Sequence, residues 1–289
     1  MSLGRSTAVS HTGRRRRHNE DAYVCTPPLF AIADGMGGAR AGEVASGLAA
    51  AAVKSAEGGG SPSERVVALI QEANRRIYQR SLEDAQVSGM GTTMTVAIVE
   101  GSTVTFGHVG DSRAYTLRDG VLEQLTDDHS LVAELVRGGK LSPEEAEHHP
   151  RRSVITRALG TDPDVDVDTF VVEALPGDVF LLCSDGLTDM VSDEAIERAL
   201  TEGPDLRAAA EELVRLANKA GGEDNITVVA FEIAADAAEP DERTVEQTQP
   251  LPAVAEPGRP RESSRSFLPL ALLLLAIAAA AMLLWLVAR

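Results

Sequence analysis

Carboxylates stand at the ends of short apolar runs at several places in this 289-residue sequence. The run 29–33 ends in Asp34-Gly35, and the run 179–183 ends in Ser184-Asp185-Gly186. Asp and Gly are the commonest turn residues, so each pair alone predicts no more than a turn. The pattern recurs at three further places, and five occurrences indicate one shared site if the ends converge: Gly110-Asp111-Ser112, Glu223-Asp224-Asn225 and Asn19-Glu20-Asp21.

Such a site would have the chemistry of a metal centre. Carboxylates gathered in a small volume repel one another, and divalent cations are the natural compensation. The side chains are hard oxygen ligands without an accompanying His or Cys cluster, which points to Mg²⁺ or Mn²⁺ rather than Zn²⁺. The residue types indicate which metal ions would bind. The existence of the site depends on the further assumption that the strand ends lie close together.

The glycines after Asp34 allow another interpretation, which the sequence disfavours. A phosphate-binding loop needs the pattern GxxxxGK[ST], and the stretch 35–42 lacks its lysine. The acidic stretch 162–169 likewise lacks the glycine of an EF-hand loop, and Leu175 stands where the bidentate glutamate is required. We therefore expect 35–42 to turn into a helix and 162–169 to be a polar turn into a strand.

Five motifs follow one another in the order RxxNED, DGMGG, GDSR, SDGL and GEDNIT. In this order the sequence resembles the PPM/PP2C family of metal-dependent protein serine/threonine phosphatases, in its bacterial form. The resemblance covers about residues 5–233 and includes all the main acidic motifs of the family. It implies an α+β fold, an α-β-β-α sandwich of two antiparallel sheets flanked by helices, with a metal cluster in a cleft at one end.

The resemblance also implies which residues bind the first metal ions. Asp34 resembles the carboxylate that bridges two ions, with the carbonyl of Gly35 as a further ligand. Asp185 and Asp224 are similar to the remaining ligands of the first ion. Two or three Mn²⁺ or Mg²⁺ ions are the cofactors implied.

Further site residues are implied in the same way. Glu20 and Asp21 stand where the family holds the second ion, directly or through waters. Asp111, together with Asp185, resembles the site of a third ion in bacterial members. Arg16 matches the arginine that grips the substrate phosphate, and it lies within the arginine run 14–17.

The implied reaction is hydrolysis of phosphoserine and phosphothreonine by a water bridging two divalent ions. The ions and a guanidinium offset charge on the phosphate oxygens, and arginine can do so through two hydrogen bonds. A protonated group near the leaving oxygen would help as general acid. Some family members have histidine directly after the DG pair, where this chain has Met36, so the general acid stays unassigned.

The histidines of the chain receive structural interpretations. His148 and His149 lie in the segment 131–159, which matches the mobile flap over the bacterial active site, and we expect surface loop residues there. His129, just before the flap, is expected to be structural rather than catalytic. His108 lies within a predicted strand and is expected to be a core residue with its hydrogen bonds satisfied.

Strands and helices must bring these residues together. The stretch Ser61-Pro62-Ser63-Glu64 is a capping box, and apolar residues at helical spacing predict a helix continuing to Ile77. A second helical region is predicted at 192–220, ended by Gly221-Gly222. Strands are predicted at 92–99, 103–109, 114–117, 121–125, 168–172, 179–183 and 226–233, with a hairpin turn at Asp119-Gly120. Most predicted strands are joined by hairpins, and the long helices do not alternate regularly with them. This pattern favours antiparallel sheets layered with helices.

The C-terminal part of the chain differs in composition from the rest. Residues 1–233 are predicted to be the phosphatase domain, and residues 234–266, rich in Pro, Glu, Gln and Ser, a disordered linker. Residues 267–287 carry no charge over about 21 positions, enough for one transmembrane helix. Arginines at 259, 261 and 265 precede it, against Arg289 beyond it, so we expect a single-pass anchor in the cell membrane with a cytoplasmic catalytic domain.

Charge and cysteine content restrict the partners. A net charge of −17 argues against nucleic acid, because phosphate contacts need a basic surface. Cys25 and Cys183 are expected to be reduced, buried thiols of an intracellular protein. The resemblance implies phosphoproteins as partners, in a bacterium membrane Ser/Thr kinases and their substrates. The competing hypothesis is a phosphatase-like module that binds phosphoproteins without hydrolysing them; an intact set of repelling carboxylates argues against it.

Overall fold

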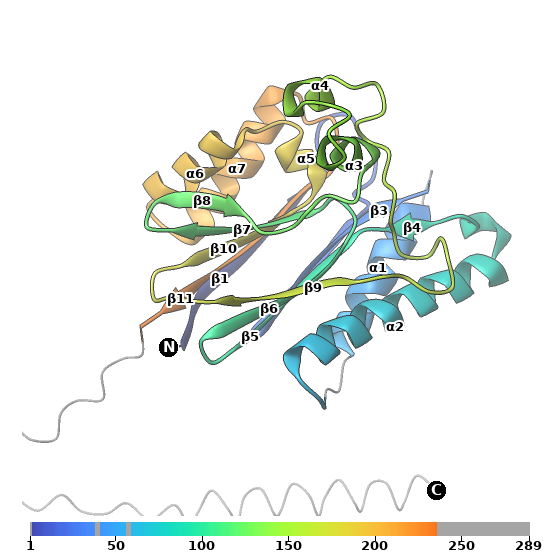
Figure 1. Cartoon of the computed structure of the whole chain (residues 1–289), viewed down its shortest axis with the longest axis horizontal. Coiled ribbons are helices and arrows are strands. Elements are labelled where there is room, and N and C mark those ends of the chain that lie inside the picture. Colours follow the sequence, from blue (N-terminus) through green and yellow to red (C-terminus); the bar gives the residue numbers. More distant parts are fainter. Residues whose placement is uncertain (1, 38–40, 56–58, 236–289) are drawn as a thin grey trace, which may run out of the picture. The chain divides into compact units, whose positions relative to one another are not determined.

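Two antiparallel sheets packed face to face form the centre of the domain (Figure 1). The structure, a computed structural model, describes residues 2–37, 41–55 and 59–235. One sheet has the strand order β1-β11-β10-β7-β8 and the other β2-β3-β5-β6-β9, with the short β4 paired to β3. The first sheet contains β1 (Ser2–His11), β7 (Arg113–Arg118), β8 (Val121–Gln124), β10 (Val179–Cys183) and β11 (Ile226–Ala234). The second contains β2 (Asp21–Thr26), β3 (Leu29–Met36), β4 (Gly91–Thr92), β5 (Met94–Glu100), β6 (Thr103–Val109) and β9 (Asp168–Glu173).

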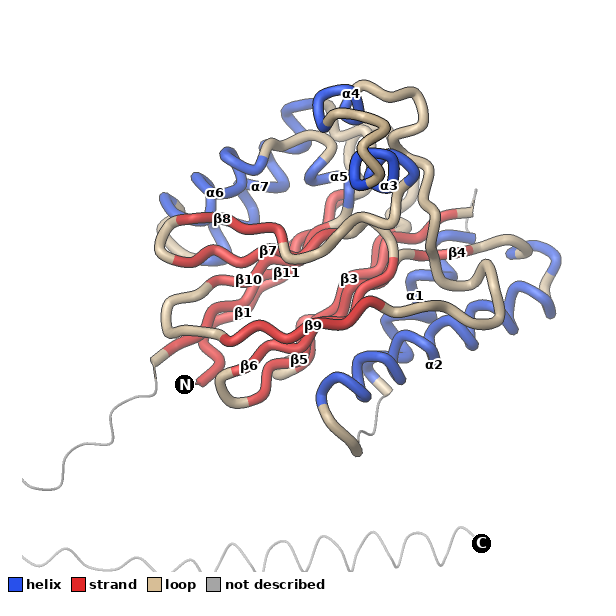
Figure 2. The backbone as a smooth tube through the Cα atoms, viewed as in Figure 1, coloured by secondary structure: helices blue, strands red, loops and turns tan. Residues whose placement is uncertain are grey.

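Helices cover the outer face of each sheet, so the order of layers is α-β-β-α (Figure 2). Helices α1 (Ala41–Lys54) and α2 (Pro62–Glu83) pack on the second sheet. Helices α5 (Asp185–Thr188) and α7 (Leu206–Ala220) pack on the first, with α6 (Asp193–Glu202) against α7. The predicted α+β sandwich of two antiparallel sheets is confirmed.

Aromatic residues fill the space between the two sheets. The rings of Phe30 on β3 and Phe231 on β11 stack with centroids 4.1 Å apart, and Phe180 on β10 stacks on Phe231 at 5.2 Å. Phe106 on β6 lies 6.0 Å from Phe180. All four are fully buried, and each contributes roughly 1.5–3 kcal/mol by leaving water. This layer holds the sheets in register and so fixes which strand ends face each other.

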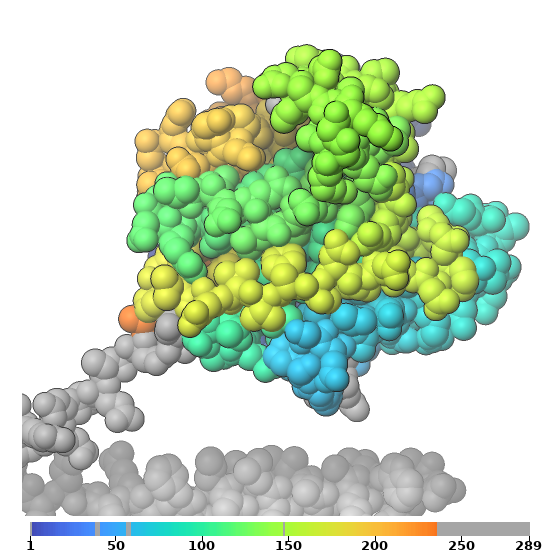
Figure 3. Space-filling view, in the orientation of Figure 1, coloured from blue at the N-terminus to red at the C-terminus, as the bar shows by residue number. Residues whose placement is uncertain are grey.

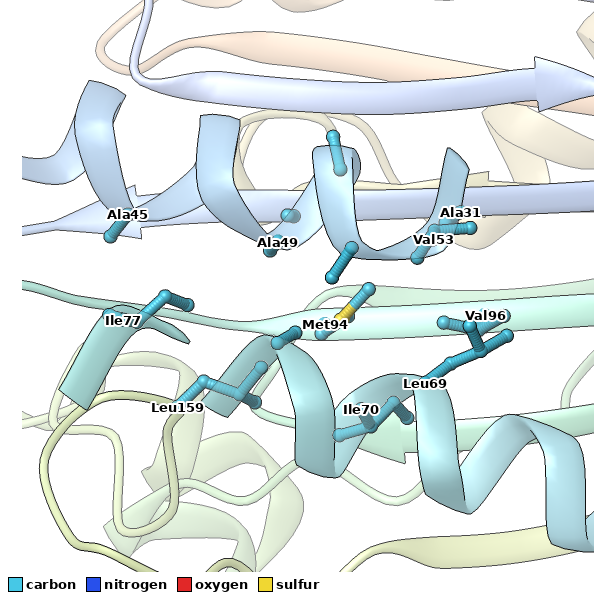
Figure 4. Packing of buried hydrophobic residues seen from close by; sticks show 14 of the residues in the cluster. Ala31, Ala45, Ala49, Val53, Leu69, Ile70, Ile77, Met94, Val96 and Leu159 are labelled. Atoms are coloured by element: carbon cyan, nitrogen blue, oxygen red, sulfur yellow. The ribbon is translucent and has the colours of Figure 1, made fainter. Parts of the chain in front are cut away.

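A second core lies between α1, α2 and the second sheet (Figure 4). The contacting face of α1 is made of small residues such as Ala45 and Ala49, which let the helix lie close to β3. On α2, Leu69, Ile70 and Ile77 repeat at helical spacing and are buried. The predicted capping box at the start of α2 is present, with the side chains and backbones of Ser61 and Glu64 bonded reciprocally.

The structure differs from the predicted elements at three places. The long helical region expected at 192–220 consists of two helices, α6 and α7, because Pro204 has no N–H to continue α6 and Asp205 caps α7. The strand expected at 92–99 is interrupted at Thr93, between β4 and β5. The longest strand, β1, was not predicted, because its alternation of polar and small residues gives a weak hydrophobic pattern.

The predictions for the C-terminal part fall on residues outside those described. Neither the linker beyond residue 235 nor the segment 267–287 is described. Within the described ranges, no helix has both the length and the apolar character needed to cross a membrane. Both cysteines are free; Cys183 is buried as expected, whereas Cys25 is half-buried on β2.

Candidate metal centre

A cavity of about 490 Å³ opens at one end of the sandwich, where both sheets deliver acidic residues. Asp34 and Asp111 come from the ends of β3 and β6 in the second sheet. Asp185 and Asp224 come from the end of β10 and the start of β11 in the first. The full lining is Arg16, Arg17, His18, Glu20, Asp34, Gly35, Met36, Gly37, Asp111, Ser153, Ile155, Asp185 and Asp224.

The sequence-predicted site residues are therefore brought together, with one exception. Arg16, Glu20, Asp34, Gly35, Asp111, Asp185 and Asp224 all line the cavity. Asp21 does not line it, and pairs with Asp34 across the β2–β3 ladder. Its Oδ2 accepts hydrogen bonds from Ser184 Oγ at 2.9 Å and Thr227 Oγ1 at 2.6 Å. Asp21 thus joins the two sheets next to Asp34, and its role as a metal ligand stays a prediction.

The backbone around Asp34 is fixed on both sides. Asp34 N donates to Thr93 Oγ1 at 3.0 Å, and Asp34 O accepts from Thr93 N at 2.9 Å and Thr92 Oγ1 at 2.8 Å. Gly35 N donates to Glu20 O at 3.1 Å. A Cβ on Gly35 would lie 2.1 Å from the carbonyl oxygen of Gly42, so only glycine lets α1 begin this close to the carboxylate.

The electrostatics of the cavity favour a cation. Burial, together with the neighbouring carboxylates, raises the pKa of Asp34 and of Asp185 well above the ordinary value for aspartate. Burial likewise raises the pKa of Asp21 and of Asp111 to about 6. Each raised pKa means that the charged form of the carboxylate is unfavourable unless a positive charge lies nearby.

Two buried oxygens show where that compensation is needed. Oδ1 of Asp21 and Oδ1 of Asp185 are buried and have no hydrogen-bond partner among the described residues. Unpartnered carboxylate oxygens in an all-oxygen donor set fit a hard divalent cation such as Mn²⁺ or Mg²⁺. Among the described residues, no group of three or more Asp, Glu, His or Cys side chains is arranged to coordinate a metal ion as it stands. The roles of these residues as metal ligands therefore stay predictions.

Among the described residues, Arg16 forms the only ion pairs with the carboxylates that line the cavity. Arg16 Nη2 lies 2.5 Å from Asp224 Oδ2, and its Nη1 lies 3.9 Å from Glu20 Oε2. The Arg16 side chain remains about half exposed, at 48%. A guanidinium held beside the acidic cluster and open to solvent is suited to bind a phosphate that enters the cavity.

Several contacts of the site were not predicted from the sequence. Asn225 Oδ1 accepts from Glu20 N at 2.7 Å, while its Nδ2 donates to the carbonyls of Thr12 and His18 at 3.0 and 2.9 Å. It thereby fixes the loop that carries Arg16. Ser153 and Ile155 of the flap line the cavity, and so do Arg17 and His18. These contacts join residues far apart in the sequence, which leaves no local signal for them.

The flap segment contributes Ser153 and Ile155 to the lining of the cavity. It contains α3 (Leu131–Arg137) and α4 (Pro143–Glu147), and it stands above the sandwich as the bright green part of Figure 3. Neither His148 nor His149 within it lines the cavity; His148 is exposed and His149 half-buried.

His108 and His129, the two histidines expected to be structural, are both buried. His108 is buried on β6, with Nδ1 2.9 Å from Thr95 Oγ1 and Nε2 3.2 Å from Asp127 O. His129 is also buried, and its ring lies 4.8 Å from that of His108. The acidic stretch at 162–169 is a polar turn that leads into β9, as predicted.

Comparisons with known proteins identify the same family along most of the chain. A family model described as Protein phosphatase 2C matches residues 11–227. Serine/threonine phosphatase stp of Listeria monocytogenes serotype 4b is 44% identical over 237 residues, which cover 76% of this chain and 92% of that protein. Serine/threonine protein phosphatase PstP of Mycobacterium tuberculosis is 43% identical over 257 residues, 88% of this chain and about half (48%) of PstP.

Solved structures agree with these matches. The crystal structure of M. tuberculosis PstP/Ppp has a TM-score of 0.77 at 42% identity, covering 81% of this chain and 100% of that one. The catalytic domain of PstP in complex with two manganese ions has a TM-score of 0.75 at 41% identity, covering 81% of this chain and 99% of that one. The chain therefore belongs to the PP2C family of metal-dependent serine/threonine protein phosphatases, in its bacterial form.

Proposed function

We propose that this protein hydrolyses phosphoserine and phosphothreonine in phosphoproteins at the cavity between the sheet ends. The observation that carries the proposal is the convergence of Asp34, Asp111, Asp185 and Asp224 from four strands of two sheets. Family membership and the manganese-bound PstP domain support it. Divalent ions, when bound there, lower the pKa of water and offset the charge of the phosphate oxygens.

Each residue of the chain has a defined task in this proposal. Asp34, the Gly35 carbonyl, Asp185 and Asp224 would hold the first two Mn²⁺ or Mg²⁺ ions. Glu20 lines the same cavity and would hold the second ion together with Asp21, the other predicted ligand. Asp111 would complete a third ion site with Asp185.

Binding of the phosphate is assigned to Arg16. Its guanidinium donates in a planar fork that can engage two phosphate oxygens at once. The ion pair with Asp224 sets the orientation of the side chain beside the acidic cluster. Met36 also lines the cavity, but its thioether has no proton to give, so it is not a candidate for protonating the leaving oxygen.

The test is hydrolysis of a phosphothreonine peptide with Mn²⁺, with EDTA, and by Asp185→Asn. We expect phosphate release with Mn²⁺, none with EDTA, and a large loss in Asp185→Asn. Asp119→Asn, the same change at an exposed hairpin turn, is the matched control and should remain active. Activity that survives both EDTA and Asp185→Asn would exclude the metal-dependent reaction. Peptide binding without hydrolysis in every condition would instead favour a phosphoprotein-binding module.

We also propose that the domain is tethered to the cytoplasmic face of the cell membrane, where it opposes membrane Ser/Thr kinases. The support is the uncharged stretch 267–287 and the arginines that precede it. A tether raises the effective concentration of the phosphatase near membrane-bound substrates.

Fractionation of cells expressing the full chain or a chain ending at residue 266 tests the tether. We expect the full chain with the membranes and the shortened chain in the soluble fraction, with equal activity on a soluble peptide. At equal amounts, the shortened chain should leave the kinases more phosphorylated. A full chain found in the soluble fraction would contradict the anchor.

A further inference from the structure

His129 bonds in both directions to the turn that carries Asp111. Its backbone N–H donates to Gly110 O at 2.8 Å, and its ring Nδ1 accepts from Gly110 N at 3.0 Å. Gly110 has a φ of 114°, and a Cβ there would lie 2.5 Å from the Cβ of Thr93. The turn is thus in a conformation reserved for glycine, and His129 satisfies both polar backbone groups at its first residue.

The other side of the same turn is fixed independently. Ser112 Oγ lies 2.7 Å from Thr93 Oγ1, and Ser112 O accepts from Thr95 Oγ1 at 3.0 Å. Asp111 therefore stands between two anchored residues, and the anchor on its N-terminal side is His129.

His129 is also the point where the flap joins the domain. Its carbonyl accepts from Thr156 N at 2.8 Å, and the next residue, Ser130, forms a β-bridge with Ile155. Ile155 and Ser153 lie on this returning leg of the flap, residues 153–156, and line the cavity. One residue thus bonds to the turn of Asp111 and to the leg that lines the cavity.

The second ring nitrogen fixes the orientation of the imidazole. Because Nδ1 accepts from Gly110 N, the proton of the neutral ring is on Nε2, which lies 3.0 Å from Asp168 Oδ2 at the start of β9. Arg157 Nη1 donates to the other oxygen of Asp168 at 2.6 Å. The buried ring is therefore held at both nitrogens, which suits a rigid connection.

We propose that His129 is a positioning residue that joins the Asp111 turn to the returning leg of the flap, so that ion binding at Asp111 and substrate binding under the flap strengthen each other. The proposal rests on the proposed function, since it assigns Asp111 to the third ion and the flap leg to the substrate. By linkage, the effect of substrate on ion affinity equals the effect of the ion on substrate affinity.

Calorimetric titration of Mn²⁺ tests the proposal, with and without a peptide that carries a phosphonate in place of phosphothreonine. In the wild type we expect the peptide to strengthen the weakest Mn²⁺ step by at least about fivefold. In His129→Leu that step should weaken by about tenfold, and the peptide should no longer strengthen it. His129→Asn retains an acceptor near the Nδ1 position and should restore most of the affinity.

Two further variants keep the outcome decisive. Asp168→Ala, at a half-exposed position, removes the acceptor of Nε2 and the partner of Arg157 but leaves the bonds of His129 to Gly110 in place. It should weaken the same step less, which provides a test if His129→Leu does not fold. His148→Leu is the matched control on the exposed part of the flap and should titrate as the wild type. The proposal would be overturned if the peptide still strengthened Mn²⁺ binding in folded His129→Leu as much as in the wild type. If His129→Leu does not fold, the same result in Asp168→Ala would overturn it. Equal weakening of all Mn²⁺ steps would do the same. No step of the experiment needs turnover, so its failure is distinct from an absence of phosphatase activity.

Discussion

At the scale of single residues, the domain depends on places where backbone segments pass so close to a glycine that a side chain would not fit. Gly35 shows this best, because the backbone carbonyls of Gly42 and Glu20 lie 2.1 and 2.6 Å from the position of a Cβ. Neither atom can rotate away. The start of α1, the loop that carries Arg16 and the carboxylate of Asp34 therefore meet around one glycine.

Gly35→Ala should destabilise the fold and disable the site. We expect the free energy of unfolding to fall by about 1–3 kcal/mol and activity to fall by about a hundredfold, because Asp34 is displaced with its neighbour. Urea denaturation and peptide hydrolysis measure the two effects. Gly47→Ala is the matched control in α1, where a Cβ meets nothing within 4 Å, and it should be neutral or stabilising. Equal losses in both variants would contradict the role assigned to the close approach.

His108 should make stability depend on pH. Burial, with a smaller effect of His129, lowers its pKa from 6.5 to about 4, although Asp128 and Asp168 act in the opposite direction. Between these values the unfolded chain binds a proton that the folded chain excludes. The contribution is therefore complete above pH 6.5 and is lost as the pH falls toward 4.

Chemical denaturation of the wild type and His108→Asn measures this contribution. Between about pH 7 and pH 4.5 the wild type should lose about 2.5 kcal/mol more of its unfolding free energy than the variant. Other groups titrate in both proteins and cancel in the comparison. A parallel loss in the two proteins would show that His108 is protonated in the folded state.

The sequence predicted the acidic half of the site better than its supports. Asp34 follows an apolar run directly, and Asp111 and Asp185 each follow one after a single residue, so that local pattern is visible without a structure. The bonds of Asn225 to the loop 12–20 and of His129 to Gly110 join distant segments, and neither is preceded by a periodic pattern. Such supports are decided by tertiary packing, which a local pattern does not encode.

At the scale of elements, strong local signals predicted the structure and weak ones did not. The capping box at Ser61 and the Asp119-Gly120 turn act through neighbouring atoms, and both form as expected. The edge strand β1 is polar or small at most positions and is specified by its pairing with β11. Its existence depends on a strand more than 200 residues away, as in the pair Thr7 and Ala230.

The cap of α2 should contribute measurably to stability. In Ser61→Ala the backbone N–H of Glu64 loses its partner, and the reciprocal bond of the Glu64 side chain loses its geometry. We expect unfolding free energy to fall by about 1 kcal/mol, measured by urea denaturation. Ser192→Ala, at the start of α6, is a suitable comparison because that side chain makes no capping bond, and its effect should be smaller. If Ser192→Ala lost more unfolding free energy than Ser61→Ala, the capping box would not be the cause of the destabilisation.

At the scale of the whole molecule, the site is shared between the two sheets. Asp34 and Asp111 belong to one sheet, and Asp185 and Asp224 to the other. The stacked phenylalanines hold the sheets together in the middle, whereas at the cavity end the carboxylates push them apart. Divalent ions bound between the carboxylates should therefore stabilise the sandwich as well as complete the site.

Thermal unfolding should depend on Mn²⁺ accordingly. At a free Mn²⁺ concentration about a hundredfold above its dissociation constant, we expect stabilisation by about 2.7 kcal/mol, seen as a rise in Tm that EDTA reverses. Asp185→Asn should lose most of this rise, while Asp119→Asn should retain it. Identical Mn²⁺ responses of the two variants would place the ions elsewhere on the protein.

The closure of the flap at its base has a consequence for how this domain can diversify. Leu131 N donates to Val154 O at 2.9 Å, and Ser130 is bridged to Ile155, so the two ends of the segment lie side by side. Residues 132–153 form a loop whose length and sequence can change without moving the strands that hold the carboxylates. Relatives could therefore differ in this one segment, and so in the surface that contacts the substrate, while the carboxylates of the site stay in place.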